Sequence, residues 1–177
     1  METSAHSPML NMLISDAMTG NTPRIHIRPF MPGDQDAFRS LNEAWIAKYF
    51  VIEPADREVL EDPVGNILAR GGHIFMALAD SRPVGCCALL PMGPGEFELA
   101  KMTVSEQERG RGIGRKVLEY AITQAKKFGA TRLYLETNRK LVNAIHLYES
   151  VGFQHVSPEQ VIPSPYARAN VFMEMDI

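Results

Sequence analysis

The chain is poor in cysteine. Its only two cysteines, Cys86 and Cys87, are neighbours in the sequence, and adjacent cysteines do not have the geometry of an ordinary disulfide. In a strand their side chains would point to opposite faces of the sheet. A chain without disulfides is typical of a reducing compartment, so the sequence predicts a cytoplasmic protein.

The chain also lacks long apolar runs and a strong charge of either sign. No run approaches the ~18 apolar residues of a membrane-spanning helix, and the N-terminus has no basic segment of the kind that opens a secretion signal. The net charge is −3, and the five histidines have no metal-ligand spacing. We therefore expect no membrane, nucleic acid or metal ion among the partners of this protein.

What is present describes an ordinary globular chain. The sequence has 177 residues, of which 45% are hydrophobic, enough for one domain with its own core. Residues 1–22 are rich in Met, Ser, Thr and Asn, and we expect them to form a flexible extension. The remaining residues, 23–177, are expected to form a single domain.

Apolar periodicity predicts alternating strands and helices along this domain. The expected strands are 25–30, 73–79, 83–90, 96–104, 132–137, 153–156 and 170–176, and the expected helices are 34–49, 56–60, 113–128 and 141–150, with a further turn near 67–70. Three antiparallel strands come before the helix at 113, and one crossover helix follows them. This order is typical of a mixed α/β fold.

A glycine-rich basic loop lies between a strand and the clearest helix. It reads Arg109-Gly-Arg-Gly-Ile-Gly-Arg-Lys116. Its glycines let backbone N–H groups turn toward an anion, and the helix that follows adds its positive N-terminal end. Cations at a helix N-terminus are unfavourable by themselves, so the four basic residues also indicate an anion. The loop predicts a site for a phosphate-rich ligand.

Two other interpretations of the loop stay open at this point. It is also compatible with a flexible basic turn, and with the fingerprint of a nicotinamide dinucleotide site. Gly110 and Gly112 fit the first two glycines of that fingerprint, and Glu136 lies at a plausible ribose-binding distance. However, Arg115 occupies the third glycine position, and most of the chain precedes the loop, whereas a dinucleotide unit usually opens its domain.

Two motifs together resemble the GNAT superfamily of N-acetyltransferases. The segment Arg109-x-x-Gly112-x-Gly114 fits the pyrophosphate-loop motif of that family, [Gln/Arg]-x-x-Gly-x-[Gly/Ala]. About 30 residues on, Asn143-Ala-Ile-His-Leu-Tyr148-Glu-Ser-Val-Gly152-Phe153 resembles its second motif, in which Leu-Tyr and Gly-Phe recur. The resemblance is strongest over residues 96–153. It implies the GNAT fold, a mixed, mostly antiparallel sheet of about seven strands flanked by about four helices.

The resemblance also implies where acetyl-CoA binds. The pyrophosphate would be held by the loop, whose residues are Arg109, Gly110, Arg111, Gly112, Ile113, Gly114 and Arg115. The strand before the loop would carry a bulge and splay from its neighbour, which leaves an opening for the pantetheine arm. A backbone N–H of Met102, Thr103 or Val104 would polarise the thioester carbonyl there. Asn143 is expected near the pantetheine.

The same resemblance implies two catalytic residues. Tyr148 would donate a proton to the sulfur of coenzyme A, although its helical spacing also fits a core aromatic residue. Glu98 lies where some family members carry a general base, although it also fits a solvated strand carboxylate. Four acidic residues near the second helix, Asp56, Glu58, Glu61 and Asp62, fit a solvated face better than an amine-binding surface. Tyr166 and Arg168 fit either a turn or an acceptor contact.

Taken together, the motifs predict an acetyl-CoA-dependent N-acetyltransferase. It would transfer the acetyl group directly to a primary amine of a small-molecule or peptide acceptor, without a metal ion. The alternative is a non-catalytic module of the same fold that binds acetyl-CoA as a sensor or partner subunit. A homodimer is compatible with the resemblance. The sequence does not identify the acceptor.

Overall fold

The computed structural model describes residues 23–177, and the expected N-terminal extension, residues 1–22, lies outside the described residues. The strands are β1 (Ile25–Pro29), β2 (His73–Ala79), β3 (Arg82–Gly93), β4 (Glu96–Val104), β5 (Arg132–Thr137), β6 (Gln154–His155) and β7 (Val171–Asp176). The helices are α2 (Gln35–Tyr49), α3 (Pro54–Glu61), α4 (Pro63–Asn66), α5 (Ile113–Lys127) and α6 (Val142–Val151), with short 3-10 turns η1 (Leu68–Arg70), η2 (Glu106–Glu108) and η3 (Pro158–Gln160).

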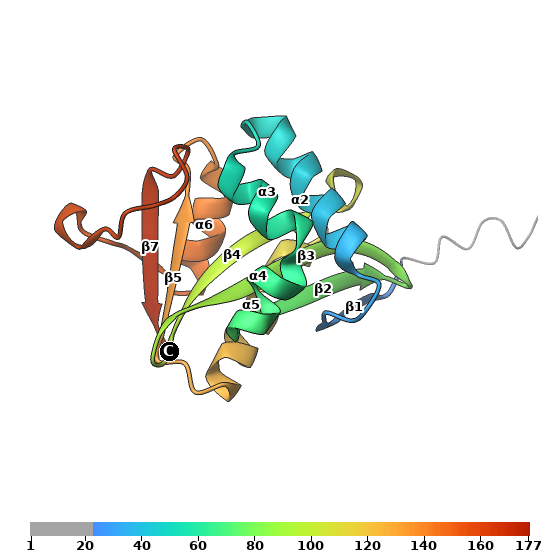
Figure 1. Ribbon diagram of the computed structural model, residues 1–177, viewed down its shortest axis with the longest axis horizontal. Helices are drawn as coiled ribbons and strands as arrows, with labels where there is room; N and C mark the ends of the chain where they lie inside the picture. Colours follow the sequence, from blue (N-terminus) through green and yellow to red (C-terminus); the bar gives the residue numbers. More distant parts are fainter. Residues whose placement is uncertain (1–22) are drawn as a thin grey trace, which may run out of the picture.

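The seven strands form one sheet in the order β1-β2-β3-β4-β5-β7-β6. Every neighbouring pair is antiparallel except β4 and β5. These two strands are parallel because helix α5 connects them as a crossover. Figure 1 shows the labelled strands and the helices packed against them. The predicted mixed, mostly antiparallel sheet of about seven strands is confirmed.

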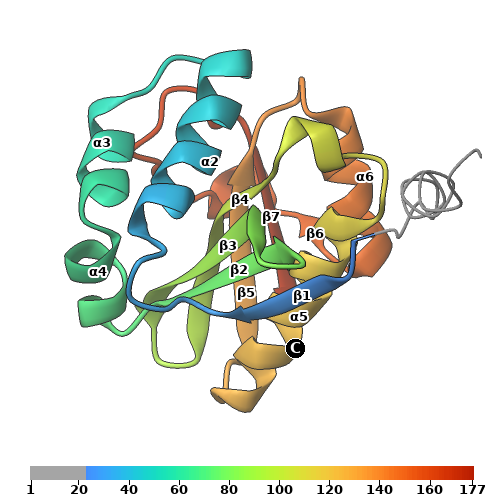
Figure 2. The same cartoon turned by 90° about the vertical axis from the view of Figure 1, so that its right-hand side faces the viewer.

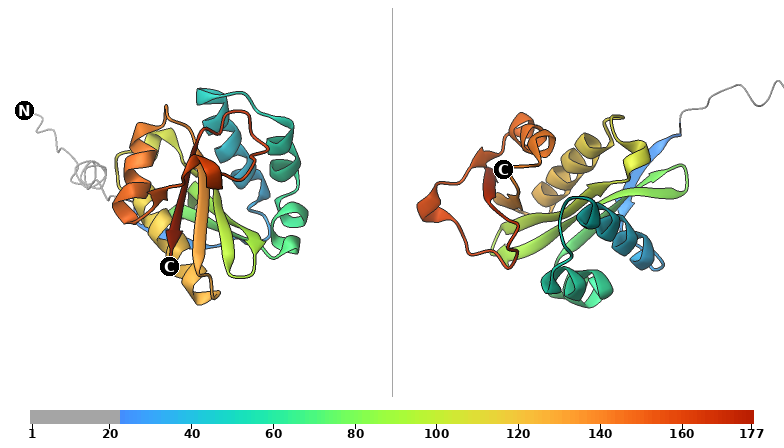
Figure 3. Two further views of the ribbon diagram at one scale, coloured as in Figure 1. Left: turned by 90° about the vertical axis from the view of Figure 1, so that its left-hand side faces the viewer. Right: turned by 90° about the horizontal axis from the view of Figure 1, so that it is seen from above.

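Helices cover both faces of this sheet. Figures 2 and 3 show α2, α3 and α4 on one face and α5 and α6 on the other. Val117 of α5 and Leu133 of β5 belong to the core on the α5 side, whereas Phe38 of α2 belongs to the core on the opposite side. Cys87 lies in the first core and Cys86 in the second, both fully buried. Alternation along β3 therefore separates the two cysteines, as the sequence predicts.

Strand β4 carries a bulge. Cys86 of β3 pairs with Thr103, but Ala88 pairs with Ala100, so β4 has one residue more than β3 between these two pairs. Lys101 lies in this interval with φ of +50°, a backbone conformation that is uncommon for residues other than glycine. The expected bulge therefore lies directly before the segment Met102–Val104.

The sheet opens on the other side of the same strand. β4 pairs with β5 only at Glu96, Phe97 and Glu98. Both strands continue beyond these pairs, β4 to Val104 and β5 to Thr137, but they no longer pair with each other. This is the splayed strand pair that the resemblance implies.

The element boundaries differ from the expected ones in small ways. Helix α3 starts at Pro54 rather than at 56, because Glu53 and Asp56 form a capping box and Pro54 takes the first helical position. The turn after Pro63 forms α4, so residues 23–177 hold five α-helices rather than about four. None of the helices in this part of the chain is long and apolar enough to cross a membrane.

Candidate active site

A cavity of about 780 Å³ lies where β4 and β5 separate. Its walls come from α2, β4, the glycine loop, the start of α6 and the loop before β7. All but one of the residues that the resemblance singles out line it: Glu98, Met102, Thr103, Val104, Arg109, Gly110, Gly112, Ile113, Gly114, Arg115, Asn143 and Tyr148. The structure thus brings together motifs that are separated by a helix and a strand in the sequence.

The glycine loop has the backbone conformation that its sequence predicts. Gly110 and Gly112 have φ of +75° and +74°, values that favour glycine. Gly112 is the N-cap of α5 and no side chain caps the helix, so its first N–H groups remain available to an anion. No atom lies within 4 Å of the position that a Cβ at Gly110 or Gly112 would take. The loop therefore presents open backbone at the N-terminal end of the helix.

The arginines of the loop do not all face the cavity. Arg111 is bonded to the carboxylate of Glu108, which is buried and also accepts a hydrogen bond of 2.6 Å from Arg82. Arg111 is not among the lining residues. The anionic partner of Arg111 is therefore Glu108. The expectation that all four basic residues of the loop indicate a bound anion is wrong for the side chain of Arg111. The side chain of Arg109 lies at the cavity, where it donates to the hydroxyl of Tyr49 at 2.7 Å.

The end of β4 forms the part of the cavity wall next to the loop, where the Val104 carbonyl accepts a hydrogen bond of 3.3 Å from Arg109. Met102, Thr103 and Val104 follow the bulge and line the cavity. The side-chain oxygen of Thr103 is buried and has no hydrogen-bond partner among the described residues. A buried hydroxyl without a partner is costly, so a polar group of a ligand would satisfy it. This is an observation on the protein itself that fits a bound coenzyme.

Glu98 lies at the last pair before the strands separate. Burial, and secondarily the nearby carboxylate of Glu136, raise its pKa to about 7, although Lys101 acts in the opposite direction. At neutral pH a large fraction of such a carboxyl group is ionised and able to accept a proton, and its conjugate acid is not too weak to release it. Glu98 is half-buried at the cavity wall, which is compatible with the general base that the resemblance implies.

Tyr148 lies on the α6 side of the cavity. It is 9% exposed and packs edge-on against Phe153, with ring centroids 6.0 Å apart. Burial raises the pKa of its phenol further above the ordinary value of 10.0, so the hydroxyl keeps its proton at neutral pH. Tyr148 is therefore both a core aromatic residue and a cavity residue. Asn143, five residues earlier on α6, is exposed and lines the cavity.

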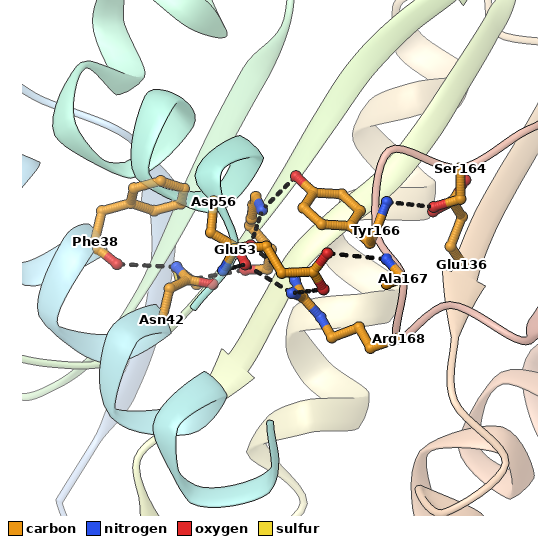
Figure 4. A network of polar contacts seen from close by, with 11 residues as sticks. Phe38, Asn42, Glu53, Asp56, Glu136, Ser164, Tyr166, Ala167 and Arg168 are labelled. Carbon is orange, nitrogen blue, oxygen red and sulfur yellow. Dashed lines mark hydrogen bonds and ion pairs between the residues drawn. The ribbon is translucent and has the colours of Figure 1, made fainter. Parts of the chain in front are cut away.

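A network of buried ion pairs connects α3, β4 and the loop before β7 beside the cavity, as Figure 4 shows. Asp56 of α3 is fully buried and accepts hydrogen bonds from Lys101 at 3.0 Å and from both terminal nitrogens of Arg168 at 2.7 Å. Arg168 also pairs with Glu53 at 3.0 Å, and the Lys101 ammonium donates to the Tyr166 hydroxyl at 2.9 Å. The expectation of a solvated acidic face is therefore wrong for Asp56.

Sequence reasoning missed Lys101 and Asp56 as site residues. Both belong to elements that were located correctly, but they lie 45 residues apart. For Lys101, the one indication in the sequence was its strand position, since alternation places Glu96 and Glu98 on one face of β4 and Lys101 off that face. Tyr166 and Arg168, which fitted either a turn or an acceptor contact, line the cavity and belong to the network.

An aromatic cluster at the end of α2 forms the remaining wall. Trp45 lies 5.5 Å from Tyr49 and 5.9 Å from Phe50 between ring centroids, and all three residues line the cavity. The wall is therefore apolar and aromatic on the α2 side and charged at β4 and β5.

Among residues 23–177, no group of three His, Cys, Asp or Glu side chains is arranged to hold a metal ion.

Known proteins share this sequence and fold. The chain is 33% identical over 99 residues to the uncharacterized N-acetyltransferase YjgM of Escherichia coli K12, a match of 54% of this chain and 59% of that protein. It is 26% identical over 153 residues to the uncharacterized N-acetyltransferase C1271.07c of Schizosaccharomyces pombe, covering 83% and 91% of the two chains. The match thus spans less than two thirds of the first relative and most of the second.

Solved structures share the fold. A GNAT acetyltransferase of Staphylococcus aureus Mu50 superimposes with a TM-score of 0.78 at 23% identity, covering 86% of this chain and 99% of that one. The PaiA N-acetyltransferase of Thermoplasma acidophilum, solved in complex with coenzyme A, superimposes with a TM-score of 0.69 at 21% identity, covering 87% and 99%.

The family comparison decides between the interpretations of the loop. Residues 35–153 match the model of the acetyltransferase (GNAT) family, which spans the glycine loop, both catalytic candidates and the splayed strands. A nicotinamide site does not account for this match. The chain therefore belongs to the GNAT family, the N-acetyltransferases that take their acetyl group from acetyl-CoA.

Proposed function

We propose that this protein transfers the acetyl group of acetyl-CoA directly to a primary amine in the cavity between β4 and β5. The observation that carries the proposal is the meeting, in one cavity, of an uncapped helix N-terminus, a bulged strand end, a carboxyl group with a pKa near neutrality and a protonated phenol. Acetyl-CoA supplies the activated acetyl group as a thioester.

The loop holds the pyrophosphate in this proposal. Backbone N–H groups from Arg109 to Arg115 and the first turn of α5 provide donors and the positive end of the helix dipole. Arg109 adds a cation at the cavity wall, whereas Arg111 contributes through its backbone because its side chain binds Glu108. Asn143 is placed to contact the pantetheine arm.

Glu98 removes a proton from the acceptor ammonium, because only an uncharged amine has a lone pair for attack. The amine nitrogen then forms a bond to the acetyl carbon while the carbon–sulfur bond breaks. A backbone N–H of Met102, Thr103 or Val104 stabilises the negative charge on the carbonyl oxygen. Tyr148 gives its proton to the leaving sulfur. The second proton, which the nitrogen loses as the amide forms, passes to the Tyr148 phenolate, and Glu98 releases the ammonium proton to solvent, so that the protons balance.

The test is transfer itself. Purified protein is incubated with acetyl-CoA and a broad panel of amines, and free coenzyme A thiol is measured together with the acetylated amine by mass spectrometry. We expect thiol release to equal the amount of acetylated amine. Binding of acetyl-CoA without release for any amine would instead support the alternative, a non-catalytic acetyl-CoA-binding module. The homodimer remains a prediction that gel filtration with light scattering can test.

A further inference from the structure

The acceptor end of the cavity carries two carboxylates without a cationic partner. Glu98 of β4 pairs in register with Tyr134 of β5, and Glu136 follows two residues later on the same face of β5. Both line the cavity. Neither belongs to an ion pair among the described residues; Glu136 accepts a hydrogen bond from the hydroxyl of Ser164. The open end of the splay therefore carries two carboxyl groups outside any ion pair. Burial raises the pKa of both, and a cation bound between them would favour their charged forms.

A buried tyrosine of β5 lies next to these carboxylates in the sheet. Tyr134 is 1% exposed, and its hydroxyl has no hydrogen-bond partner of normal geometry among residues 23–177. Burial, and secondarily the charges of Glu136 and Glu98, raise the pKa of this hydroxyl, whereas the backbone of Ile162 acts in the opposite direction. Tyr134 does not line the cavity, so a ligand there would contact the two carboxylates and not this hydroxyl.

The cations of the acceptor end are already used by the protein. Lys101 and Arg168 line the cavity, but they pair with Asp56 and Glu53, which lie behind them. Their side chains are only 6% and 17% exposed. A carboxylate on the acceptor would have to compete with Asp56 for these groups while lying close to Glu98 and Glu136. The arrangement therefore attracts an ammonium and disfavours a carboxylate beside it.

The position of Glu136 is fixed by the loop before β7. Ser164 donates to Glu136 through its hydroxyl, and the same hydroxyl accepts a hydrogen bond of 3.0 Å from the backbone N–H of Tyr166. Figure 4 shows Ser164 and Glu136 beside Tyr166 and Arg168. On the other wall, Trp45 and Phe50 offer apolar surface to the body of a ligand.

We propose that the acceptor is a primary amine with an apolar body and no carboxylate on the carbon that bears the nitrogen, and that Glu136 binds its ammonium group before Glu98 takes the proton. This inference rests on the proposed function and names its substrate class. α-Amino acids are excluded as good acceptors by the same arrangement. Glu136 sets specificity, whereas Glu98 performs the proton transfer.

The experiment compares amines that differ only by a carboxylate. Acetylation of tyramine is measured against tyrosine, and of tryptamine against tryptophan, by thiol release and mass spectrometry. We expect kcat/KM to be at least tenfold higher for each amine than for its amino acid. Glu136→Gln keeps the size of the side chain and an oxygen that accepts the hydrogen bond from Ser164. In this variant we expect the KM for tyramine to rise at least tenfold. We also expect the ratio of kcat/KM between each amine and its amino acid to become smaller.

The controls separate this inference from the proposed function. Glu61→Gln changes an exposed carboxylate of α3 outside the cavity and is expected to leave the preference unchanged, and acetyl-CoA affinity measured by calorimetry should be the same in all variants. Equal or better acetylation of the amino acids would overturn the inference but leave the acetyltransferase intact. An unchanged KM and preference in Glu136→Gln would overturn the role of Glu136. Absence of acetylation with every amine would contradict the proposed function itself.

Discussion

In the proposed mechanism Glu98 and Tyr148 are two acids with opposite tasks, and burial affects the pKa of both. Burial raises the pKa of both groups, since it disfavours the charged form of any acid. For Glu98, whose ordinary pKa is 4.5, the shift to about 7 suits the proposed role of proton acceptor. For Tyr148, whose ordinary pKa is 10.0, the shift only strengthens its retention of the proton.

Replacing Tyr148 with phenylalanine tests its role as the acid. The ring and its contact with Phe153 remain, so the fold and acetyl-CoA affinity should be unchanged. We expect kcat to fall by about 10²–10⁴-fold, the usual contribution of general acid–base catalysis. Steady-state kinetics, with calorimetry for the affinity, provide the measurement. If Tyr148→Phe keeps the wild-type kcat, Tyr148 is not the acid, and its role is to pack in the core.

The pH dependence of activity tests Glu98. Because the base must be ionised, kcat/KM should rise with pH up to about 7, the pKa of Glu98, and then level off. In Glu98→Gln this dependence near neutrality should disappear, and kcat/KM at pH 8 should fall by about 10²–10⁴-fold. A variant that retains the wild-type profile would exclude Glu98 as the base.

The same substitution should stabilise the protein above neutral pH. The folded protein holds a proton on Glu98 between pH 4.5 and about 7 that the unfolded chain releases, so the free energy of unfolding falls as pH rises through this interval. Glutamine does not ionise, so Glu98→Gln does not lose this free energy of unfolding as the pH rises. We expect Glu98→Gln to be more stable than the wild type by ~1–3 kcal/mol at pH 8 and equal to it near pH 4, measured by denaturant unfolding. A difference independent of pH would contradict the assignment.

At the scale of elements, β4 connects the two halves of the cavity. Its bulge turns the segment Met102–Val104 toward the glycine loop, while Lys101 at the bulge reaches back to Asp56 of α3. The positive φ of Lys101 is unfavourable by itself and coincides with two hydrogen bonds of its ammonium group, to Asp56 and to Tyr166. The ion-pair network thus holds the bulge in place.

Removing Asp56 should therefore destabilise the fold. Asp56→Ala would leave Lys101, which is 6% exposed, and Arg168 without their shared partner. We expect a loss of about 3–5 kcal/mol in the free energy of unfolding, the cost of breaking a buried ion pair on one side. Chemical denaturation gives the measurement.

Glu58→Gln is the matched control for this change. Glu58 lies on the same helix, is 66% exposed and approaches Arg70 only at 4.0 Å. Its replacement should alter stability by less than about 0.5 kcal/mol, as is usual for exposed pairs. Equal effects of the two substitutions would show that the network does not stabilise the protein.

At the scale of the whole molecule, the sequence predicted one half of the site better than the other. The order of strands and helices and the coenzyme side follow from continuous motifs, because residues 109–115 and 143–153 each form one local element. The acceptor side depends on contacts between distant segments: Asp56 meets Lys101 over 45 residues and Arg168 over 112. Local periodicity contains no information on such pairs.

Errors in the sequence interpretation have the same origin. Asp56 was expected on a solvated face because it belongs to an acidic helical segment together with Glu58, Glu61 and Asp62. Only the packing of α3 against β4 and the loop before β7 buries it. Likewise, Arg111 looked like part of an anion site until the fold placed Glu108 beside it. Asp56 contacts Lys101 and Arg168 where the sequence suggested solvent. Arg111 contacts Glu108 where the sequence suggested an anionic ligand.

The most direct test of the central claim is calorimetric titration of acetyl-CoA into the wild-type protein and Gly112→Glu. At Gly112, φ of +74° disfavours any side chain, and a carboxylate at the N-terminus of α5 would repel the pyrophosphate. We predict micromolar binding to the wild type and its loss in Gly112→Glu, with circular dichroism showing that both proteins are folded. Equal affinity of the two proteins, or no binding to either, would contradict the assignment of this cavity to acetyl-CoA.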